Sequence, residues 1–89
     1  MQFRWDSNKD RINRRKHGVS FDEATTVFGD PLAMTVSDPD HSMGEERFAT
    51  LGRTMAGRLV VVIYTDDGDI VRIISAREAS THERNRYES

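Results

Sequence analysis

The apolar residues change from a helical to an alternating pattern near residue 32. Before that point the segment "QFRW" (2–5) alternates and predicts a short strand. Asp6 or Ser7 can then cap a helix that runs to His17, and Gly18 follows in the left-handed position that commonly ends a helix. The chain is therefore expected to open with a strand and a polar helix.

A second helix is predicted from Ser20, which forms a capping box with Glu23. Helical spacing gives this segment one core-facing stripe, formed by Phe21, Ala24, Val27 and Phe28. The Gly-Asp-Pro sequence at 29–31 ends it, because proline cannot continue a helix. Two short helices therefore precede the rest of the fold.

From Leu32 onward the pattern has period two and predicts four strands, at 32–37, 47–52, 58–64 and 69–75. The segment 58–64 is apolar on both faces, so we expect it to be the best buried. Ser80 and Glu83 form a second capping box, which opens a final helix to about Tyr87 or Glu88. The predicted fold class is α+β, in which a short N-terminal strand, two helices, a four-stranded antiparallel meander and a C-terminal helix follow in order. The helices are expected against one face of the sheet.

Length and composition narrow the possibilities. A chain of 89 residues predicts a single domain over 1–89, and the lack of cysteine excludes disulfides and thiolate zinc sites. The longest apolar run, 59–64, is too short to span a bilayer, and the N-terminal segment lacks the apolar region of a signal peptide. We therefore expect a soluble, cytoplasmic protein.

Charge is segregated along the chain, although the formal net charge is only −2. Residues 1–17 carry six basic side chains against two acids, whereas 18–46 carry seven acids and no lysine or arginine. The overall field would repel phosphates, which argues against a protein that coats DNA. The pattern favours a local basic site, or an acidic surface for a basic partner.

The segment "RRKHGVSFDEA" (14–24) has the spacing of a helix-turn-helix. In that motif the first turn of the second helix faces DNA bases. Here that turn consists of Phe21, Asp22 and Glu23, whose carboxylates would be repelled by phosphates. The sequence therefore disfavours DNA reading by this segment.

The first predicted helix presents Lys9, Asn13, Lys16 and His17 on one face. One interpretation is a solvated basic face, with His17 favoured by the dipole at the helix C-terminus. The other is a phosphate site in which His17 acts as acid or base near neutral pH. The residues alone leave both open.

Arginine also occurs inside the predicted last strand, where Arg72 lies between Ile70 and Ile74 on one face. Arg77 lies on the opposite face if the strand stays regular. Arg72 can form a structural pair with Glu45 or Glu46, or it can clamp a phosphate. Arg47 and Arg58 can serve the same site, and Tyr87 offers a hydroxyl or a stacking ring.

The acidic segment "DPDHSMGEE" (38–46) offers oxygen and nitrogen ligands for a divalent metal. Its spacing matches neither a calcium-binding EF-hand loop nor a zinc motif, which favours an exposed acidic loop. There is no glycine-rich phosphate loop, and no serine has the context of a nucleophile. We therefore predict that the protein uses neither a metal nor a cofactor.

Several segments together closely resemble one known family, and they extend from Phe3 to Glu88. They are "FRWD", "NRRKHGVSFDEA", "VFGDPLA", "DPDHSMGEERF", "LVVVIYT" and "RIISAREASTHERNRYE". The chain resembles the BrnT family, the toxins of bacterial type II toxin-antitoxin systems. The resemblance implies a compact RelE-like fold and a metal-independent ribonuclease that inhibits translation. It also implies neutralisation by a BrnA antitoxin with a ribbon-helix-helix domain, through which alone the toxin would associate with DNA.

The implied reaction is attack of an RNA 2′-hydroxyl on the adjacent phosphate, which needs a base, an acid and positive charge. On this basis we expect His17 or Glu46 to act as the base. Lys16, Arg72 and Arg77 are expected at the phosphate, and Tyr87 is expected to stack or donate a proton. The RNA-binding residues expected beside them are Lys9, Asn13, Arg47 and Arg58.

Two other functions stay open at this point. The first is a non-catalytic binding module that complexes a DNA-binding partner and co-regulates its operon. The second is a metal-dependent hydrolase that uses the acidic segment. Growth arrest and RNA cleavage insensitive to EDTA would distinguish the ribonuclease from both.

Overall fold

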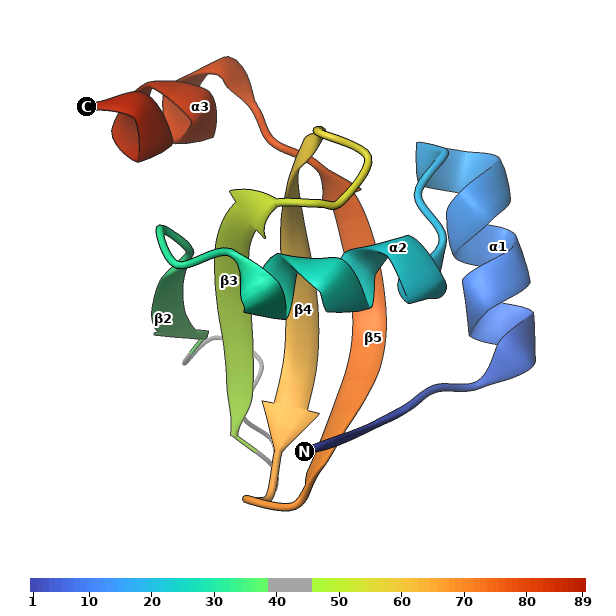
Figure 1. The fold of residues 1–89 in the computed structure, drawn as a ribbon. Helices are drawn as coiled ribbons and strands as arrows, with labels where there is room; N and C mark the ends of the chain where they lie inside the picture. The colour runs from blue at the N-terminus through green and yellow to red at the C-terminus, as the bar shows by residue number, and fades with distance from the viewer. Residues whose placement is uncertain (39–45) are drawn as a thin grey trace.

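A five-stranded sheet forms the centre of the protein (Figure 1). The computed structural model describes residues 1–38 and 46–89. The strands are β1 (Gln2–Arg4), β2 (Met34–Asp38), β3 (Arg47–Arg53), β4 (Leu59–Asp66) and β5 (Ile70–Glu78), in the order β1-β5-β4-β3-β2. Strands β2 to β5 pair antiparallel with their sequence neighbours, which confirms the predicted meander. Strand β1 pairs parallel with β5, a pairing that the sequence did not reveal.

In the described part of the chain three α-helices accompany the sheet: α1 (Ser7–His17), α2 (Phe21–Thr25) and α3 (Thr81–Glu88). The predicted second helix is α-helical only for its first five residues and continues as a 3-10 turn, η1 (Thr26–Gly29). Asp6 caps α1, and Gly18 ends it with φ of 71°, as the sequence predicts. The predicted α+β class is confirmed, whereas the four strands begin or end up to three residues away from their predicted limits.

The two predicted capping boxes have different outcomes. Ser80 and Glu83 form the complete box at the start of α3. Ser20 accepts a hydrogen bond from the Glu23 backbone N–H at 3.0 Å. The Glu23 carboxylate is instead bound by Arg58, so the second half of that box is missing.

The hydrophobic core lies between α2 with η1 and one face of the sheet, which we call the core face. Its fully buried members on the helical side are Phe21, Ala24 and Val27. They pack against the core-face side chains of β4 and β5, namely Val60, Val62, Tyr64, Val71, Ile73 and Ala76. As predicted, the central strand β4 is the best buried, since five of its first six residues are buried.

Strand β5 contains a bulge that changes which side chains share a face. Tyr64 of β4 pairs with Ile73, but the preceding residue Ile63 pairs with Ser75, so Ile74 has no partner. Because one inserted residue reverses the alternation, Arg72 and Arg77 lie on the same face of the sheet. The expectation for a regular strand, that they lie on opposite faces, is therefore wrong.

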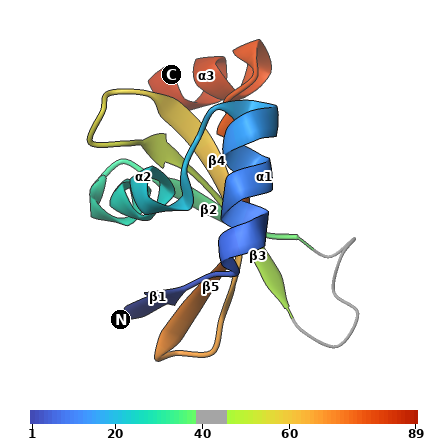
Figure 2. The same cartoon turned by 90° about the vertical axis from the view of Figure 1, so that its right-hand side faces the viewer.

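The helices do not all cover one face, in contrast to the predicted layer. Figure 2 shows α2 on one side of the sheet and α1 upright along its edge. Helix α3 lies over the other face, where Glu83 and Arg86 border the same groove as Leu51 and Val61. Among the described residues, no other helix covers that second face, and we call it the open face. Within residues 1–38 and 46–89, no helix is long and apolar enough to cross a membrane.

Asn13 fixes α1 to the sheet. Strand β1 ends at Arg4, so the backbone edge of β5 beyond Arg72 has no neighbouring strand there. The Asn13 amide fills this gap: it donates to the Ala76 carbonyl at 2.7 Å and accepts from the Ala76 N–H at 3.2 Å. It also donates to the Val19 carbonyl at 2.8 Å and is only 5% exposed. The Asn13 side chain thus makes the two hydrogen bonds that a neighbouring strand would make to Ala76, whose backbone groups would otherwise lack a partner at the sheet edge.

Candidate functional site

The open face carries a row of arginines near the end where β3 begins. The strand register places Arg47 of β3 beside Thr65 of β4, Thr65 beside Arg72 of β5, and Arg72 beside Arg4 of β1. Arg4 and Arg72 are exposed, and Arg47 is half-buried. Strands lie about 4.8 Å apart, so the row extends over about 15 Å across the sheet. We call Arg4, Arg72 and Arg47 the arginine row.

A pocket of about 320 Å³ lies beside this row. Its lining residues are Glu46, Thr65, Asp66, Asp67, Ile70 and Arg72. The Glu46 carboxylate accepts a hydrogen bond from the Ser37 hydroxyl at 3.1 Å, which restricts its orientation. The pocket therefore combines three carboxylates, those of Glu46, Asp66 and Asp67, with an arginine that is exposed to solvent.

Asp67 contributes to the same pocket from the β4–β5 turn. Backbone N–H groups of Ile70 and Asp69 donate to its carboxylate, and they lower its pKa below the ordinary value, with a smaller contribution from the charge of Arg72. Because these hydrogen bonds within the turn stabilise the charged form, the Asp67 carboxylate is ionised at neutral pH, and it lines the pocket. Glu46 is the lining carboxylate that comes from outside this turn.

Two lysines of α1 lie on the side of the helix nearer the open face. Asn13 points to β5, and Asp10 points to the start of α2, where it accepts the Phe21 N–H at 2.8 Å. Successive residues are about 100° apart around a helix. Asp10 therefore lies about 60° to one side of Asn13, and Lys9 and Lys16 lie about 40° and 60° to the opposite side. Both are exposed and extend the positive charge of the open face along its edge.

His17 lies at the opposite end of the sheet from Glu46. The carbonyl of the next residue, Gly18, accepts from Arg58, which immediately precedes β4. Glu46 is instead close to Thr65 near the other end of that strand. Six residues of β4 separate these ends, about 20 Å at the usual strand rise. His17 and Glu46 therefore do not belong to one site.

Arg77 and Tyr87 hold α3 against the body of the protein. Arg77 forms a two-pronged ion pair with Glu83, at 2.8 and 2.9 Å. The Tyr87 hydroxyl donates to Asp30 at 2.7 Å, which raises the Tyr87 pKa, and its ring lies 5.5 Å from the Arg53 guanidinium carbon. Helix α3 has no buried residue, so these polar contacts are its main anchors.

The Arg77–Glu83 pair predicts a pH-dependent contribution to stability. Hydrogen bonds from Arg77 lower the pKa of Glu83 from 4.5 to about 2. A carboxyl with a lowered folded-state pKa stabilises the fold above its unfolded pKa, and this contribution is lost as the pH falls from about 4.5 towards 2. Because both side chains are partly exposed, we expect about 1 kcal/mol. Thermal unfolding of Glu83→Gln should therefore show a melting temperature several degrees below the parent at pH 7, with a gap that narrows below pH 4.5 and closes near pH 2.

Glu88→Gln is the matched control, because Glu88 contacts Arg84 only at 4.0 Å on the exposed side of the same helix. Its melting temperature should follow that of the parent at every pH. A gap for Glu83→Gln that stays constant between pH 7 and pH 3 would contradict a contribution from the ionised carboxylate.

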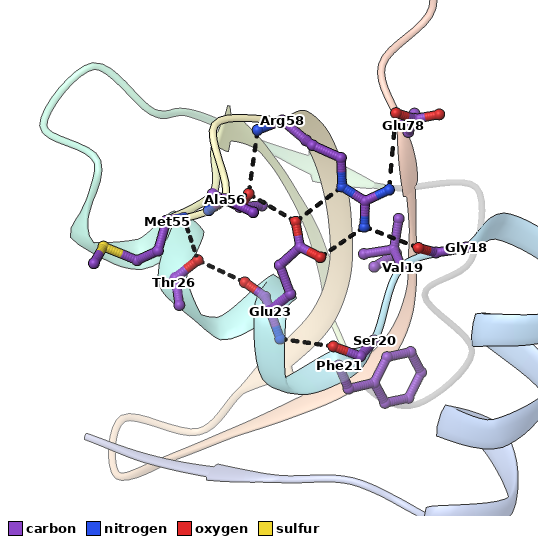
Figure 3. Close-up of polar contacts among 12 residues, drawn as sticks. Gly18, Val19, Ser20, Phe21, Glu23, Thr26, Met55, Ala56, Arg58 and Glu78 are labelled. Atoms are coloured by element: carbon purple, nitrogen blue, oxygen red, sulfur yellow. Dashed lines mark hydrogen bonds and ion pairs between the residues drawn. The ribbon is translucent and has the colours of Figure 1, made fainter.

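Arg58, another predicted RNA-binding residue, lies in a structural network near the other end of the sheet. Figure 3 shows its guanidinium between Glu23 and the Gly18 carbonyl. It donates to the two Glu23 oxygens at 3.0 and 2.6 Å and to Gly18 at 2.8 Å, which lowers the Glu23 pKa. This network ties α2 and the end of α1 to the β3–β4 turn.

The structure thus brings together only part of the predicted site. Glu46, Arg47 and Arg72 lie near one pocket, and Lys9 and Lys16 border the same face. Asn13 and Arg58 make structural contacts, Arg77 and Tyr87 anchor α3, and His17 is distant. Asp40, His41 and Glu45 of the acidic segment lie outside the described residues. Sequence reasoning missed Arg4, because only the parallel pairing of β1 places it beside Arg72.

Comparison with known proteins identifies the family of this chain. The sequence-family model described as the ribonuclease toxin BrnT of type II toxin-antitoxin systems matches residues 5–83. The chain belongs to the BrnT toxin family. The fold agrees with the crystal structure of the Brucella abortus ribonuclease toxin BrnT, with a TM-score of 0.68 at 24% identity. That alignment covers 91% of this chain and 99% of the Brucella chain, whereas a comparison with curated proteins gives no match.

Family membership agrees with the resemblance seen in the sequence. A BrnT chain is a ribonuclease toxin, so its substrate is a polyanion and its site must hold phosphates. On the described part of this chain, the arginine row sets three neighbouring arginines beside a pocket that also contains carboxylates. This match of chemistry makes the open face the candidate active face.

Proposed function

We propose that this BrnT chain cleaves RNA on the open face by metal-independent acid-base chemistry. The observation that carries the proposal is the row of Arg4, Arg72 and Arg47 next to the pocket that Glu46 and Arg72 line together. Guanidinium groups bind phosphate oxygens through paired N–H donors, and they retain their charge at any physiological pH.

In this mechanism Glu46 is the base. Its carboxylate removes the proton from an RNA 2′-hydroxyl, and the resulting oxygen attacks the adjacent phosphorus. The bond from phosphorus to the 5′ oxygen breaks, and this oxygen takes a proton from solvent water, which leaves a 2′,3′-cyclic phosphate on one fragment and a 5′-hydroxyl on the other. Ser37 holds Glu46 in orientation through the hydrogen bond at 3.1 Å.

Arg72 and Arg47 supply the positive charge. The phosphorus centre gains negative charge as it becomes five-coordinate, and fixed cations stabilise this state more than the substrate. Arg72 lines the pocket together with Glu46, so we assign it to the scissile phosphate. Arg47 lies one strand beyond Thr65 in the same row and is assigned to RNA binding, together with Lys9 and Lys16.

We further propose that a BrnA-type ribbon-helix-helix antitoxin neutralises the chain. Support comes from the family, whose members belong to two-component toxin-antitoxin systems. The chain also exposes apolar side chains of the edge strand β2, Met34 at 37% and Val36 at 55%. Exposed apolar groups of this kind are typical of surfaces that a partner protein covers.

Induction of the chain in a bacterial host tests this proposal. We expect growth to stop, and we expect co-expression of a cognate BrnA-type ribbon-helix-helix protein to restore growth. The mechanism predicts arrest because RNA is destroyed, so total RNA should show new fragments within the same period. Normal growth with soluble, folded chain present would support the alternative function, a non-catalytic binding module.

A further inference from the structure

Strand β1 places Arg4 at the end of the arginine row. In the parallel pairing, Phe3 lies beside Val71 and Arg4 lies beside Arg72. Phe3 packs against the core, with its ring centroid 5.3 Å from that of Phe28. Because successive side chains of a strand point to opposite faces, Arg4 lies on the open face with Arg72.

Two arginines side by side repel each other, and the carboxylates of the adjacent pocket, Asp67 among them, offset part of this repulsion at Arg72. Among the side chains of residues 1–37 and 46–89, neither Arg4 nor Arg72 forms an ion pair at 4.0 Å or less. The polar contact that Arg4 makes there is a hydrogen bond to the Gln2 side chain at 3.1 Å. An incoming anion would remove this repulsion and gain two guanidinium partners, which is the environment that a phosphodiester backbone supplies.

The row also has a direction. It crosses the strands at right angles, with Arg4 and Arg72 on neighbouring strands and Arg47 two strands beyond Arg72. At about 4.8 Å for each strand, the row is about 15 Å long, so a single phosphate cannot reach all three arginines, whereas successive phosphates of one extended strand can. Single-stranded nucleic acid is commonly held this way, by a basic track that follows its backbone.

We propose that Arg4 binds the phosphate next to the scissile phosphate, and that single-stranded RNA lies along the row from β3 to β1. The inference rests on the proposed function, in which Arg72 holds the scissile phosphate. Arg4 is then a substrate-binding residue that sets which bond reaches Glu46, whereas Arg72 takes part in the chemistry.

This assignment predicts a specific kinetic pattern. Arg4 contacts a phosphate that does not react, so its contact is equally strong in the substrate and in the transition state. Arg4→Gln should therefore raise KM about tenfold and leave kcat within about twofold. The slope of log KM against log salt should fall by about 0.7, the value for one lost contact to a single strand.

A neutral phosphate can show which linkage Arg4 contacts. The substrate is a single-stranded oligonucleotide with one ribonucleotide, so that it has one cleavable bond, and each flanking phosphate is replaced in turn by a methylphosphonate. In the parent protein one neutral linkage beside the cleaved bond should raise KM about tenfold. In Arg4→Gln the same linkage should have no further effect, while Arg4→Lys should retain part of the penalty.

Arg15→Gln is the matched control, since Arg15 is exposed on α1 and lies about 160° around the helix from Asn13, away from the sheet. It removes the same charge and should show the penalty of the parent. Equal penalties in Arg4→Gln and the parent at every linkage would overturn the assignment of Arg4. The same series can be measured by fluorescence anisotropy with an all-deoxy oligonucleotide, which binds but cannot react. This binding measurement tests the role of Arg4 even if the parent protein cleaves no RNA. A lack of cleavage would then contradict the proposed function but not the assignment of Arg4.

Discussion

Arg72→Ala should lower kcat/KM for RNA cleavage by about 10² to 10³ while the protein stays folded. Arg72 is exposed, so its removal leaves no cavity. It lines the pocket that contains Glu46, and its guanidinium is assigned to the phosphate oxygens that gain charge during the reaction. Initial rates on one defined RNA oligonucleotide measure the effect, and circular dichroism verifies the fold.

Two further variants make this result specific. Arg72→Lys keeps the charge but loses the planar pair of donors, so its rate should lie between those of the parent and Arg72→Ala. Arg15→Ala removes an arginine from the outer side of α1 and should retain the parent rate. An Arg72→Ala protein with more than half of the parent kcat/KM would exclude Arg72 from the site.

Asn13→Ala should lower the free energy of unfolding by about 3 kcal/mol, the largest effect on stability that we expect from one side chain. The variant loses three hydrogen bonds and leaves the Ala76 N–H and carbonyl buried at the sheet edge without their partner. A domain of this size has about 5 to 10 kcal/mol in total, so a melting temperature lower by more than 10 °C is expected. Urea unfolding followed by tryptophan fluorescence measures the change.

The comparison for Asn13 is Asn85→Ala on α3, where the side chain is exposed. Its stability should stay within about 0.5 kcal/mol of the parent. Asn13→Asp should be as damaging as Asn13→Ala, because its second oxygen would face the Val19 and Ala76 carbonyls. An Asn13→Ala protein that is as stable as the parent but binds RNA poorly would contradict the structural role and support the role in RNA binding that the sequence predicted for Asn13.

The parts of the fold that depend on local signals were predicted from the sequence. Asp6, Gly18 and the Ser80–Glu83 box mark helix ends through contacts within a few residues, and period-two alternation marks the meander. The position of β1 depends instead on a pairing between residues almost 70 positions apart. The bulge at Ile74 likewise depends on the register with β4, and the alternation of polar and apolar residues within β5 does not predict it.

The candidate site was predicted less completely for the same reason. Arg72 and Glu46 were named from their residue types, and their shared pocket agrees with that choice. Arg58 was named on the same grounds, yet a long-range ion pair with Glu23 gives it a structural role. A basic side chain in the sequence gives its charge but not its partner, so free and paired arginines can be separated only once the tertiary contacts are known.

The most direct test of the account is the chemistry of the RNA ends. The purified chain is incubated with RNA in excess EDTA, and the products are compared with those of Arg72→Ala. We predict fragments with 2′,3′-cyclic phosphate and 5′-hydroxyl ends, formed at the same rate with or without EDTA and almost absent with Arg72→Ala. Cleavage that requires added Mg²⁺, or fragments with 3′-hydroxyl ends, would contradict the proposal that this face cleaves RNA by attack of the 2′-hydroxyl.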